Sequence, residues 1–264
     1  MKLIIIAGTP GSGKTSIIKH VIEELKSNYK LFFAKFDCLN THDDEVIHQK
    51  TGIPAVKKLA EELCPDHYTA LMIPQILKKH GDKDIIIIET AGLCLRCSPY
   101  LKNCLGINVL DTTSGNPDRY GPILDQADVV AISKGNLISQ AEREIFRTRV
   151  MQKNNTAELI EIDGLTGEGA LDIAEIIENA PEFINEKQLV LRHSMPSAVC
   201  GFCYGNKTIS KTSIQNRFKS GQKIRLSGPM LNCGRCGFKS CNEFIRAVLD
   251  GKAETKQCPF RKNK

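Results

Sequence analysis

Gly8-Thr9-Pro10-Gly11-Ser12-Gly13-Lys14-Thr15 is the stretch of this 264-residue sequence that decides the fold. It fits the pattern G-x-x-x-x-G-K-[ST], and it lies between an apolar run, Leu3 to Ala7, and a helical pattern that begins at Ile17. Glycines let backbone N–H groups point inward at an anion, and the N-terminus of the following helix adds a positive dipole. The stretch therefore predicts a nucleoside triphosphate site.

The residues of this loop have separate expected roles. Lys14 reaches the β- and γ-phosphates, and the Thr15 hydroxyl binds Mg²⁺, so we expect both to be catalytic. The residues of the loop expected to bind the nucleotide are Gly8, Gly11, Ser12, Gly13, Lys14 and Thr15.

A second catalytic element should be an acidic residue at the end of a buried strand, where it holds Mg²⁺ or its water. Ile85 to Ile88 is followed directly by Glu89, and Gly92 follows in a flexible loop beside the nucleotide. Asp37, after another apolar run, is a weaker candidate for the metal. Asp43 and Asp44 suit the first turn of a helix equally well, because acidic residues are favoured there.

Short apolar runs alternate with segments of helical period. The runs are Leu3 to Ala7, Leu31 to Phe36, Ile85 to Ile88, Ile107 to Leu110 and Val129 to Ile132. Such runs suit strands buried on both faces, and the alternation predicts an α/β fold with a doubly wound, mostly parallel sheet. We place this nucleotide domain at residues 1–186 and a second, cysteine-rich region at 187–264, with one helix expected from Cys241 to Leu249.

Charge divides the chain at the same place. Residues 1–186 carry 20 basic and 27 acidic residues, whereas residues 187–264 carry 16 basic and 3 acidic ones. The basic region suggests an acidic partner, and a protein is favoured over nucleic acid because few aromatic residues are available to stack on bases. No run of about 20 apolar residues and no signal peptide is present, which indicates a cytoplasmic protein with no membrane association and with reduced cysteines.

Four cysteines near the end form a second strong pattern, Cys233-x2-Cys236-x4-Cys241-x16-Cys258. Four thiolates suit the four irons of a [4Fe-4S] cluster, in a domain of about residues 230–264. The alternative is a zinc ribbon formed by Cys200, Cys203, Cys233 and Cys236. Its spacer of 29 residues is longer than the usual 15 to 20, and it would leave Cys241 and Cys258 unexplained.

Three further stretches follow one another in order along the chain: Thr41-His42-Asp43-Asp44, Glu89-Thr90-Ala91-Gly92 and Thr166-Gly167-Glu168-Gly169. They resemble the T-K-E-D stretch, the E-x-x-G stretch and the T-G-E-G loop of the nickel-insertion GTPases of the SIMIBI class, the HypB and UreG types. The resemblance covers about residues 1–180. It implies a doubly wound domain, a nucleotide-dependent homodimer and a role in the maturation of a metalloenzyme.

The same resemblance places base recognition at Ser133, Lys134 and Asn136, with Thr166 behind the base. One position departs from the family, because its N-K-x-D aspartate is Asn136 here. An amide carries one acceptor and one donor group, so it cannot accept both guanine hydrogen bonds as a carboxylate does. GTP and ATP both stay open as the nucleotide bound with Mg²⁺.

A second resemblance concerns the terminal cysteines. The stretch from Cys233 to Cys258 resembles the four-cysteine domain of corrinoid iron–sulfur proteins, which implies one [4Fe-4S] cluster. In the nickel GTPases a transferable metal site lies near the switch loop, and Cys94 and Cys97 lie there in this chain. They are candidates, together with Cys200 and Cys203, for a second site for Ni²⁺ or Zn²⁺. The alternative is that they are small apolar residues under loops.

Three functions fit these features. The first is a nucleotide-driven maturation, metal-insertion or activation factor whose client is a nickel or corrinoid metalloenzyme. The second is a nucleotide-gated electron donor that uses the [4Fe-4S] cluster to reduce an acidic redox protein. The third, a zinc-ribbon NTPase that binds nucleic acid, is the least favoured of the three.

Overall fold

The computed structural model describes residues 1–38, 40–60, 65–92, 97–183, 189–193, 233–249 and 252–259. The chain forms two compact units, Met1–Arg217 and Phe218–Lys264, and each is described by itself. Among the described residues, no helix is both long enough and apolar enough to cross a membrane.

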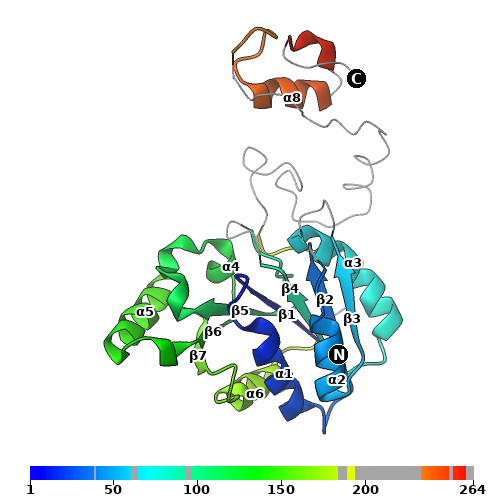
Figure 1. Ribbon diagram of the computed structural model, residues 1–264. Coiled ribbons are helices and arrows are strands. Elements are labelled where there is room, and N and C mark those ends of the chain that lie inside the picture. The colour runs from blue at the N-terminus through cyan, green and yellow to red at the C-terminus, as the bar shows by residue number, and fades with distance from the viewer. Residues whose placement is uncertain are drawn as a thin grey trace. The chain divides into compact units, whose positions relative to one another are not determined.

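A sheet of seven parallel strands organises the first unit (Figure 1). Its order is β3-β2-β4-β1-β5-β6-β7. The strands are β1 Lys2–Gly8, β2 Leu31–Asp37, β3 Ala55–Leu59, β4 Ile85–Thr90, β5 Leu105–Asp111, β6 Val129–Ser133 and β7 Glu158–Ile162. The chain moves outward from β1 in both directions, so the sheet is doubly wound and a crevice opens at the carboxyl ends of its central strands.

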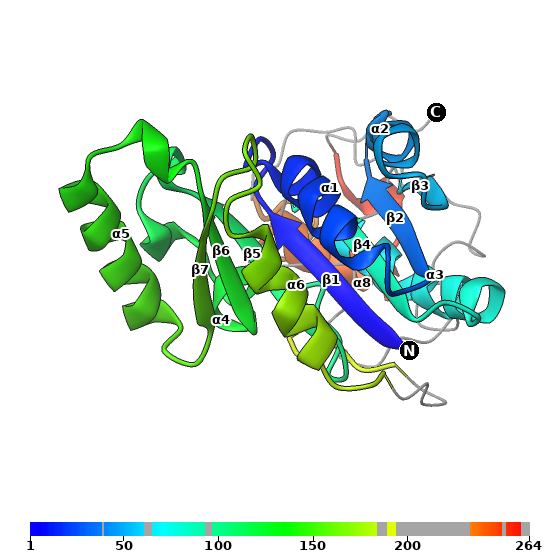
Figure 2. The same cartoon turned by 90° about the horizontal axis from the view of Figure 1, so that it is seen from below.

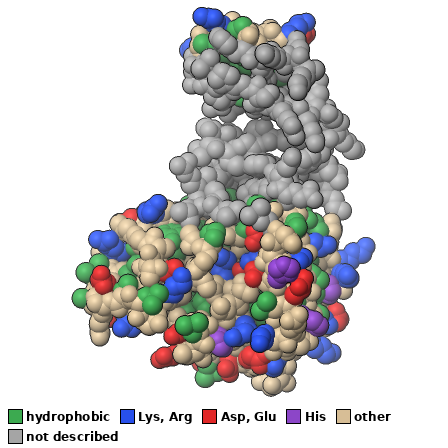
Figure 3. Space-filling model, viewed as in Figure 1, with side chains coloured by type: hydrophobic (Ala, Val, Ile, Leu, Met, Phe, Trp, Pro, Cys, Tyr) green, Lys and Arg blue, Asp and Glu red, His purple; other side chains and the backbone are tan. Residues whose placement is uncertain are grey.

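Helices cover both faces of this sheet. The helices are α1 Lys14–Leu25, α2 Asp43–Thr51, α3 Pro65–His80, α4 Pro122–Asp125, α5 Gln140–Lys153 and α6 Ala170–Asn179. On one face, α1 and α6 lie side by side (Figure 2) and pack with α2 against the strands. On the other face, α3, α4 and α5 close a second apolar cluster. Acidic and basic side chains intermingle on the face of this unit that Figure 3 shows.

The predicted fold class is confirmed, and each of the five apolar runs forms a strand. The two edge strands, β3 and β7, were not predicted. Ala55–Leu59 contains Lys57 and Lys58, and Glu158–Ile162 contains Glu158 and Glu161. Charged side chains at sheet edges discourage pairing with other chains, and they remove the apolar signal that identifies buried strands.

The first unit continues past the boundary expected at residue 186, because residues 189–193 pack on it. Leu101 and Leu191 form an antiparallel bridge, and both side chains are buried. The Arg192 guanidinium makes two bonds to the Asp128 carboxylate, of 2.8 and 2.7 Å, and donates to the carbonyl oxygens of Leu101 and Gln126. A single arginine therefore fastens this segment to the loops on either side of β5.

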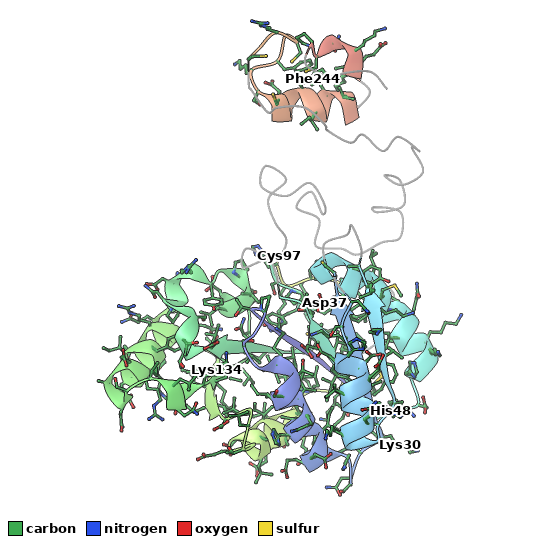
Figure 4. The ribbon with its side chains drawn as sticks, in the orientation of Figure 1. Lys30, Asp37, His48, Cys97, Lys134 and Phe244 are labelled. Carbon is green, nitrogen blue, oxygen red and sulfur yellow. The ribbon has the colours of Figure 1, made fainter. Side chains whose placement is uncertain are left out.

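The described part of the second unit is small. Its elements are α8, Cys241–Leu249, as expected from the sequence, and a 3-10 turn at Thr255–Gln257. Ser240 caps α8 by accepting a hydrogen bond from the Glu243 amide at 3.1 Å. Phe244 is buried and lies 5.4 Å from Phe238, centroid to centroid (Figure 4). This aromatic pair is the apolar centre of the described part of the unit.

Candidate functional site

The glycine-rich loop takes the shape that its sequence predicts. Gly11 and Gly13 have φ angles of 79° and 87°, in the left-handed region that favours glycine. At Gly8, an added Cβ would lie 2.3 Å from the Val109 carbonyl oxygen. Glycine is therefore required at Gly8 by close packing against β5, and at Gly11 and Gly13 by backbone conformation.

Lys14 closes this loop from inside. Its ammonium group donates to the carbonyl oxygens of Gly8 and Thr9, both at 2.9 Å. Burial lowers the pKa of Lys14 to about 8, partly offset by the negative charge of Glu89. The lysine is thus held where phosphate oxygens would enter, at the start of α1.

Thr15 and Glu89 meet at the carboxyl ends of β1 and β4. The Thr15 hydroxyl lies 3.1 Å from each oxygen of the Glu89 carboxylate, which is 1% exposed. Asp37 ends β2, at the opposite end of that strand from Lys30 (Figure 4). A hydroxyl and carboxylates are the hard oxygen ligands that Mg²⁺ prefers, so the donor set of Thr15, Glu89 and Asp37 fits this ion.

A cavity of about 520 Å³ opens at this point. Lys14, Thr15, Asp37 and Glu89, the four residues expected to be catalytic, all line it. Among the described residues, the buried hydroxyl oxygens of Thr9 and Ser12 have no hydrogen-bond partner. A phosphate group bound beside the Lys14 ammonium would supply hydrogen-bond partners for these two hydroxyl groups.

Gly92 lies directly against the phosphate loop. Its φ is 63°, and an added Cβ would lie 1.8 Å from the Gly8 carbonyl oxygen. The backbone of Gly92 therefore packs directly on the backbone of Gly8, and a movement of either residue would displace the other.

The loop after β6 is tied to the same place. Ser133 donates to the carbonyl oxygens of Ser12 and Leu110, at 2.8 and 3.2 Å. Lys134 has a φ of 60°, and its ammonium group lies 2.6 Å from Asp111 Oδ2 (Figure 4). Burial alone would raise the pKa of Asp111, but hydrogen bonds from Lys134 and Thr113 hold it below its ordinary value.

A second cavity, of about 240 Å³, lies beside this loop and is the candidate base pocket. Asn136 lines it, together with the carboxylate residues Glu161, Asp163 and Glu168. Thr166 is exposed and is not part of the lining, although its hydroxyl accepts from the Glu168 amide at 3.3 Å. The T-G-E-G loop thus reaches the pocket through Glu168.

The cysteines expected near the switch loop are only partly described. Cys94 lies outside the described residues, as do Cys200 and Cys203 of the same candidate site. Cys97 is described and lies buried (Figure 4), as does Cys104. Burial raises the pKa of the Cys104 thiol to about 12, so it is not a thiolate at neutral pH. Cys38, for which the sequence suggested no role, lines the phosphate cavity.

The four terminal cysteines are all described, and none of them forms a disulfide within the described residues. Cys233 is exposed, and Cys236, Cys241 and Cys258 are half-buried. Gly234 and Gly237 have φ angles of 69° and 85°, so the loop turns where the sequence places its glycines. No three Cys, His, Asp or Glu side chains converge on a metal position within the described ranges. The donor set fits an iron–sulfur cluster by residue type and number.

Residues that sequence reasoning missed include Lys35 of the phosphate cavity, Asp163 of the base cavity and Asp111, which pairs with Lys134. Lys35 interrupts the apolar run Leu31 to Phe36, and a charged residue in a buried strand is a signal that it has a partner. Asp111 follows the apolar run Ile107 to Leu110, as Glu89 follows its own run. Asp163 gave no such signal.

The fold and the phosphate loop define the class: the first unit is a P-loop nucleotide-binding domain. Residues 2–161 match the family described as "CobW/HypB/UreG, nucleotide-binding domain", and the chain belongs to this family. Residues 229–260 match a family described as "Putative Fe-S cluster", which covers all four terminal cysteines.

Relatives and solved structures agree with this assignment. An uncharacterized protein of Methanocaldococcus jannaschii is 46% identical over 215 residues, which are 80% of this chain and 92% of the relative. The hydrogenase maturation factor HypB of Archaeoglobus fulgidus has a TM-score of 0.56 at 25% identity, over 68% of this chain and 89% of that protein. HypB of Helicobacter pylori, solved in complex with nickel, has a TM-score of 0.56 at 21% identity, over 70% and 92%.

Proposed function

We propose that this protein hydrolyses GTP with Mg²⁺ and acts as a maturation or metal-insertion factor for a nickel or corrinoid metalloenzyme, with a [4Fe-4S] cluster in its second unit. The main support for this proposal is that one chain contains two domains. One is a nucleotide-binding domain of the CobW/HypB/UreG family, and the other is a four-cysteine domain that matches an iron–sulfur family. Nickel is included in the proposal because the structure of HypB from Helicobacter pylori was solved in complex with nickel.

The phosphate end of the site supplies the chemistry. Lys14 pairs with the β- and γ-phosphates, and Thr15, Glu89 and Asp37 hold the metal ion or its water. When bound there, Mg²⁺ neutralises charge that develops on the phosphates. The loop amides from Gly11 to Thr15 orient the chain of phosphates at the N-terminus of α1.

Guanine is favoured over adenine by the carboxylates of the base pocket. Guanine offers two adjacent donors, N1–H and the N2 amine, and carboxylates accept at both oxygens. Asp163 Oδ1 already accepts from the Leu165 amide at 2.7 Å, whereas Glu168 is exposed at the pocket. In the family, the aspartate of N-K-x-D accepts both guanine hydrogen bonds, and this position is Asn136 here. We therefore assign the acceptor role to the Glu168 carboxylate, which lines the same pocket as Asn136.

Steady-state hydrolysis of GTP and ATP tests this preference. We expect kcat/KM for GTP to exceed that for ATP by about tenfold or more, and Glu168→Gln to reduce the ratio while Asn136→Asp increases it. Glu175→Gln, on the exposed surface of α6, is the matched control. Equal use of the two nucleotides, unchanged by Glu168→Gln, would refute the assignment of the base.

The metal-insertion role is tested by Ni²⁺ and Zn²⁺ affinity in two nucleotide states. The proposal expects full-length protein to bind the ion differently with GDP and with a slowly hydrolysed GTP analogue, and expects a dimer in only one state. The second candidate, a nucleotide-gated electron donor, is favoured by the iron–sulfur match alone. It predicts instead that nucleotide shifts the reduction potential of the cluster while metal affinity stays constant.

A further inference from the structure

Lys35 is a buried lysine inside the sheet. It lies in β2, it is 4% exposed, and the strand around it is otherwise apolar up to Asp37. An ammonium group without partners is costly to bury, so a lysine at this position must be paired. The register of the sheet pairs Lys35 directly with Glu89 of β4, and parallel partners project their side chains from the same face.

The partners of Lys35 are the carboxylates of the phosphate site. Its ammonium group forms a short ion pair with Glu89, lies 2.9 Å from Asp43 Oδ2 and lies 3.8 Å from Asp37 Oδ2. These three side chains come from the ends of β4 and β2 and from the first turn of α2. Lys35 thus gathers three separate chain segments around one positive charge.

Two of these three carboxylates, Glu89 and Asp37, belong to the donor set expected for the metal ion. Glu89 also holds the Thr15 hydroxyl at 3.1 Å, so Lys35 and Mg²⁺ compete for one carboxylate. Two cations that lie close together in a partly buried site repel strongly, because their charges are screened less there than in bulk water. Lys14 places a second positive charge at the same cavity, so a metal ion would be a third cation there unless another anion enters with it.

A nucleoside triphosphate changes this balance, because it brings several negative charges into the cavity. Lys35 lines that cavity beside Lys14, so phosphate oxygens are new partners for its ammonium group. The carboxylates are then released to the metal ion.

We propose that Lys35 is a positioning residue that makes metal binding conditional on nucleotide: it holds Glu89 and Asp43 until a triphosphate arrives, so the metal ion enters only together with the nucleotide. The proposal rests on the metal-dependent use of nucleotide proposed above. It assigns Lys35 a role that the phosphate loop does not supply, since Lys14 bonds to the loop carbonyls instead.

Binding of Mn²⁺, followed by electron paramagnetic resonance, tests the proposal on full-length protein. Wild type should bind Mn²⁺ weakly alone and at least about tenfold more tightly with a GTP analogue. Lys35→Met and Lys35→Gln should each bind Mn²⁺ without nucleotide at least about tenfold more tightly than wild type, because the competing charge is gone. Lys35→Arg should restore the wild-type behaviour.

Lys57→Met is the matched control. Lys57 of β3 is the register partner of Lys35 on the other side, but it bonds to Thr41 and Glu45 and does not line the phosphate cavity. It should leave nucleotide-free Mn²⁺ affinity unchanged. Circular dichroism confirms that each variant is folded before its affinity is compared.

The nucleotide-free measurement decides the inference by itself. If a folded Lys35→Met or Lys35→Gln protein binds Mn²⁺ alone no better than wild type, Lys35 does not compete with the metal and the proposal is wrong. If both variants fail to fold, Lys35 is a structural residue and the proposal is also wrong. Failure of wild type to bind GTP or ATP would overturn the proposed function, while the nucleotide-free comparison would still give its result.

Discussion

The Thr15 hydroxyl lies 3.1 Å from both carboxylate oxygens of Glu89, although the two residues are 74 positions apart. Strand β4 lies next to β1 in the sheet, and this adjacency brings the end of one strand to the start of the helix after the other. The nucleotide chemistry proposed for this chain depends on that contact.

Glu89→Gln preserves the shape of this contact and removes its charge. We expect hydrolysis of the triphosphate to fall by about 100-fold or more, because the ligand for the metal ion is weakened where charge develops. Nucleotide binding should persist, since the phosphate loop is intact. Turnover and fluorescent-nucleotide affinity measure the two effects separately. Unchanged turnover would mean that Glu89 only ends a strand.

Gly92→Ala should weaken nucleotide binding strongly through steric conflict. The added Cβ would lie 1.8 Å from the Gly8 carbonyl oxygen, so the phosphate loop must move. Gly52→Ala is the matched control, because Gly52 also has a positive φ, of 78°, but an added Cβ meets nothing within 4 Å. We expect affinity to fall by about 100-fold or more for Gly92→Ala and to stay constant for Gly52→Ala. Equal effects of the two would contradict the packing argument.

Nucleotide affinity should depend on pH above neutrality. The pKa of Lys14 is lowered to about 8, so the free protein carries this charge below pH 8 and loses it above. Bound phosphate favours the charged form, which means that binding takes up a proton at high pH. Affinity should therefore be constant below about pH 8 and fall by up to about tenfold per pH unit above it. The Lys14→Arg variant should bind with a flat profile, and a flat profile in wild type would be the contrary result.

Arg192→Met should destabilise the first unit. The Arg192 guanidinium bonds to both oxygens of Asp128 and to carbonyl oxygens on the neighbouring loops, and these acceptors would lose their donor. We expect the free energy of unfolding to fall by about 2 kcal/mol or more. Arg147→Met, which removes an exposed ion pair 3.6 Å long, should cost less than about 1 kcal/mol. Urea unfolding measures both free energies. Equal losses for the two variants would argue against a stabilising role for the Arg192 hydrogen bonds.

Much of the fold could be predicted from the sequence because its central strands are buried on both faces. Continuous apolar runs identified β1, β2, β4, β5 and β6, and the glycines and Lys14 identified the phosphate loop. The edge strands β3 and β7 were not predicted, because charged residues such as Lys57 and Glu158 interrupt the apolar pattern there. Lys35 was not predicted to be a site residue, for a different reason. Its partner Glu89 is set by strand order, and a single sequence does not give the order of strands.

In the cysteine-rich region, the sequence predicts the kind of site better than the structure shows the arrangement of its side chains. The spacing from Cys233 to Cys258 is enough to predict a cluster, and helix α8 begins at Cys241 as expected. The described residues do not gather three of these side chains on one point. Ligand cysteines are brought together by the metal ions that they bind, so their arrangement depends on the cluster itself.

The central claim is that one chain joins a nucleotide hydrolase to a [4Fe-4S] cluster. Its most direct test is the ultraviolet–visible spectrum of anaerobically purified full-length protein, with iron, sulfide, zinc and nickel counts, beside Cys236→Ala. The account predicts a brown protein with about four irons and four sulfides per chain, both lost in the variant. A colourless protein that holds zinc and no sulfide would contradict it.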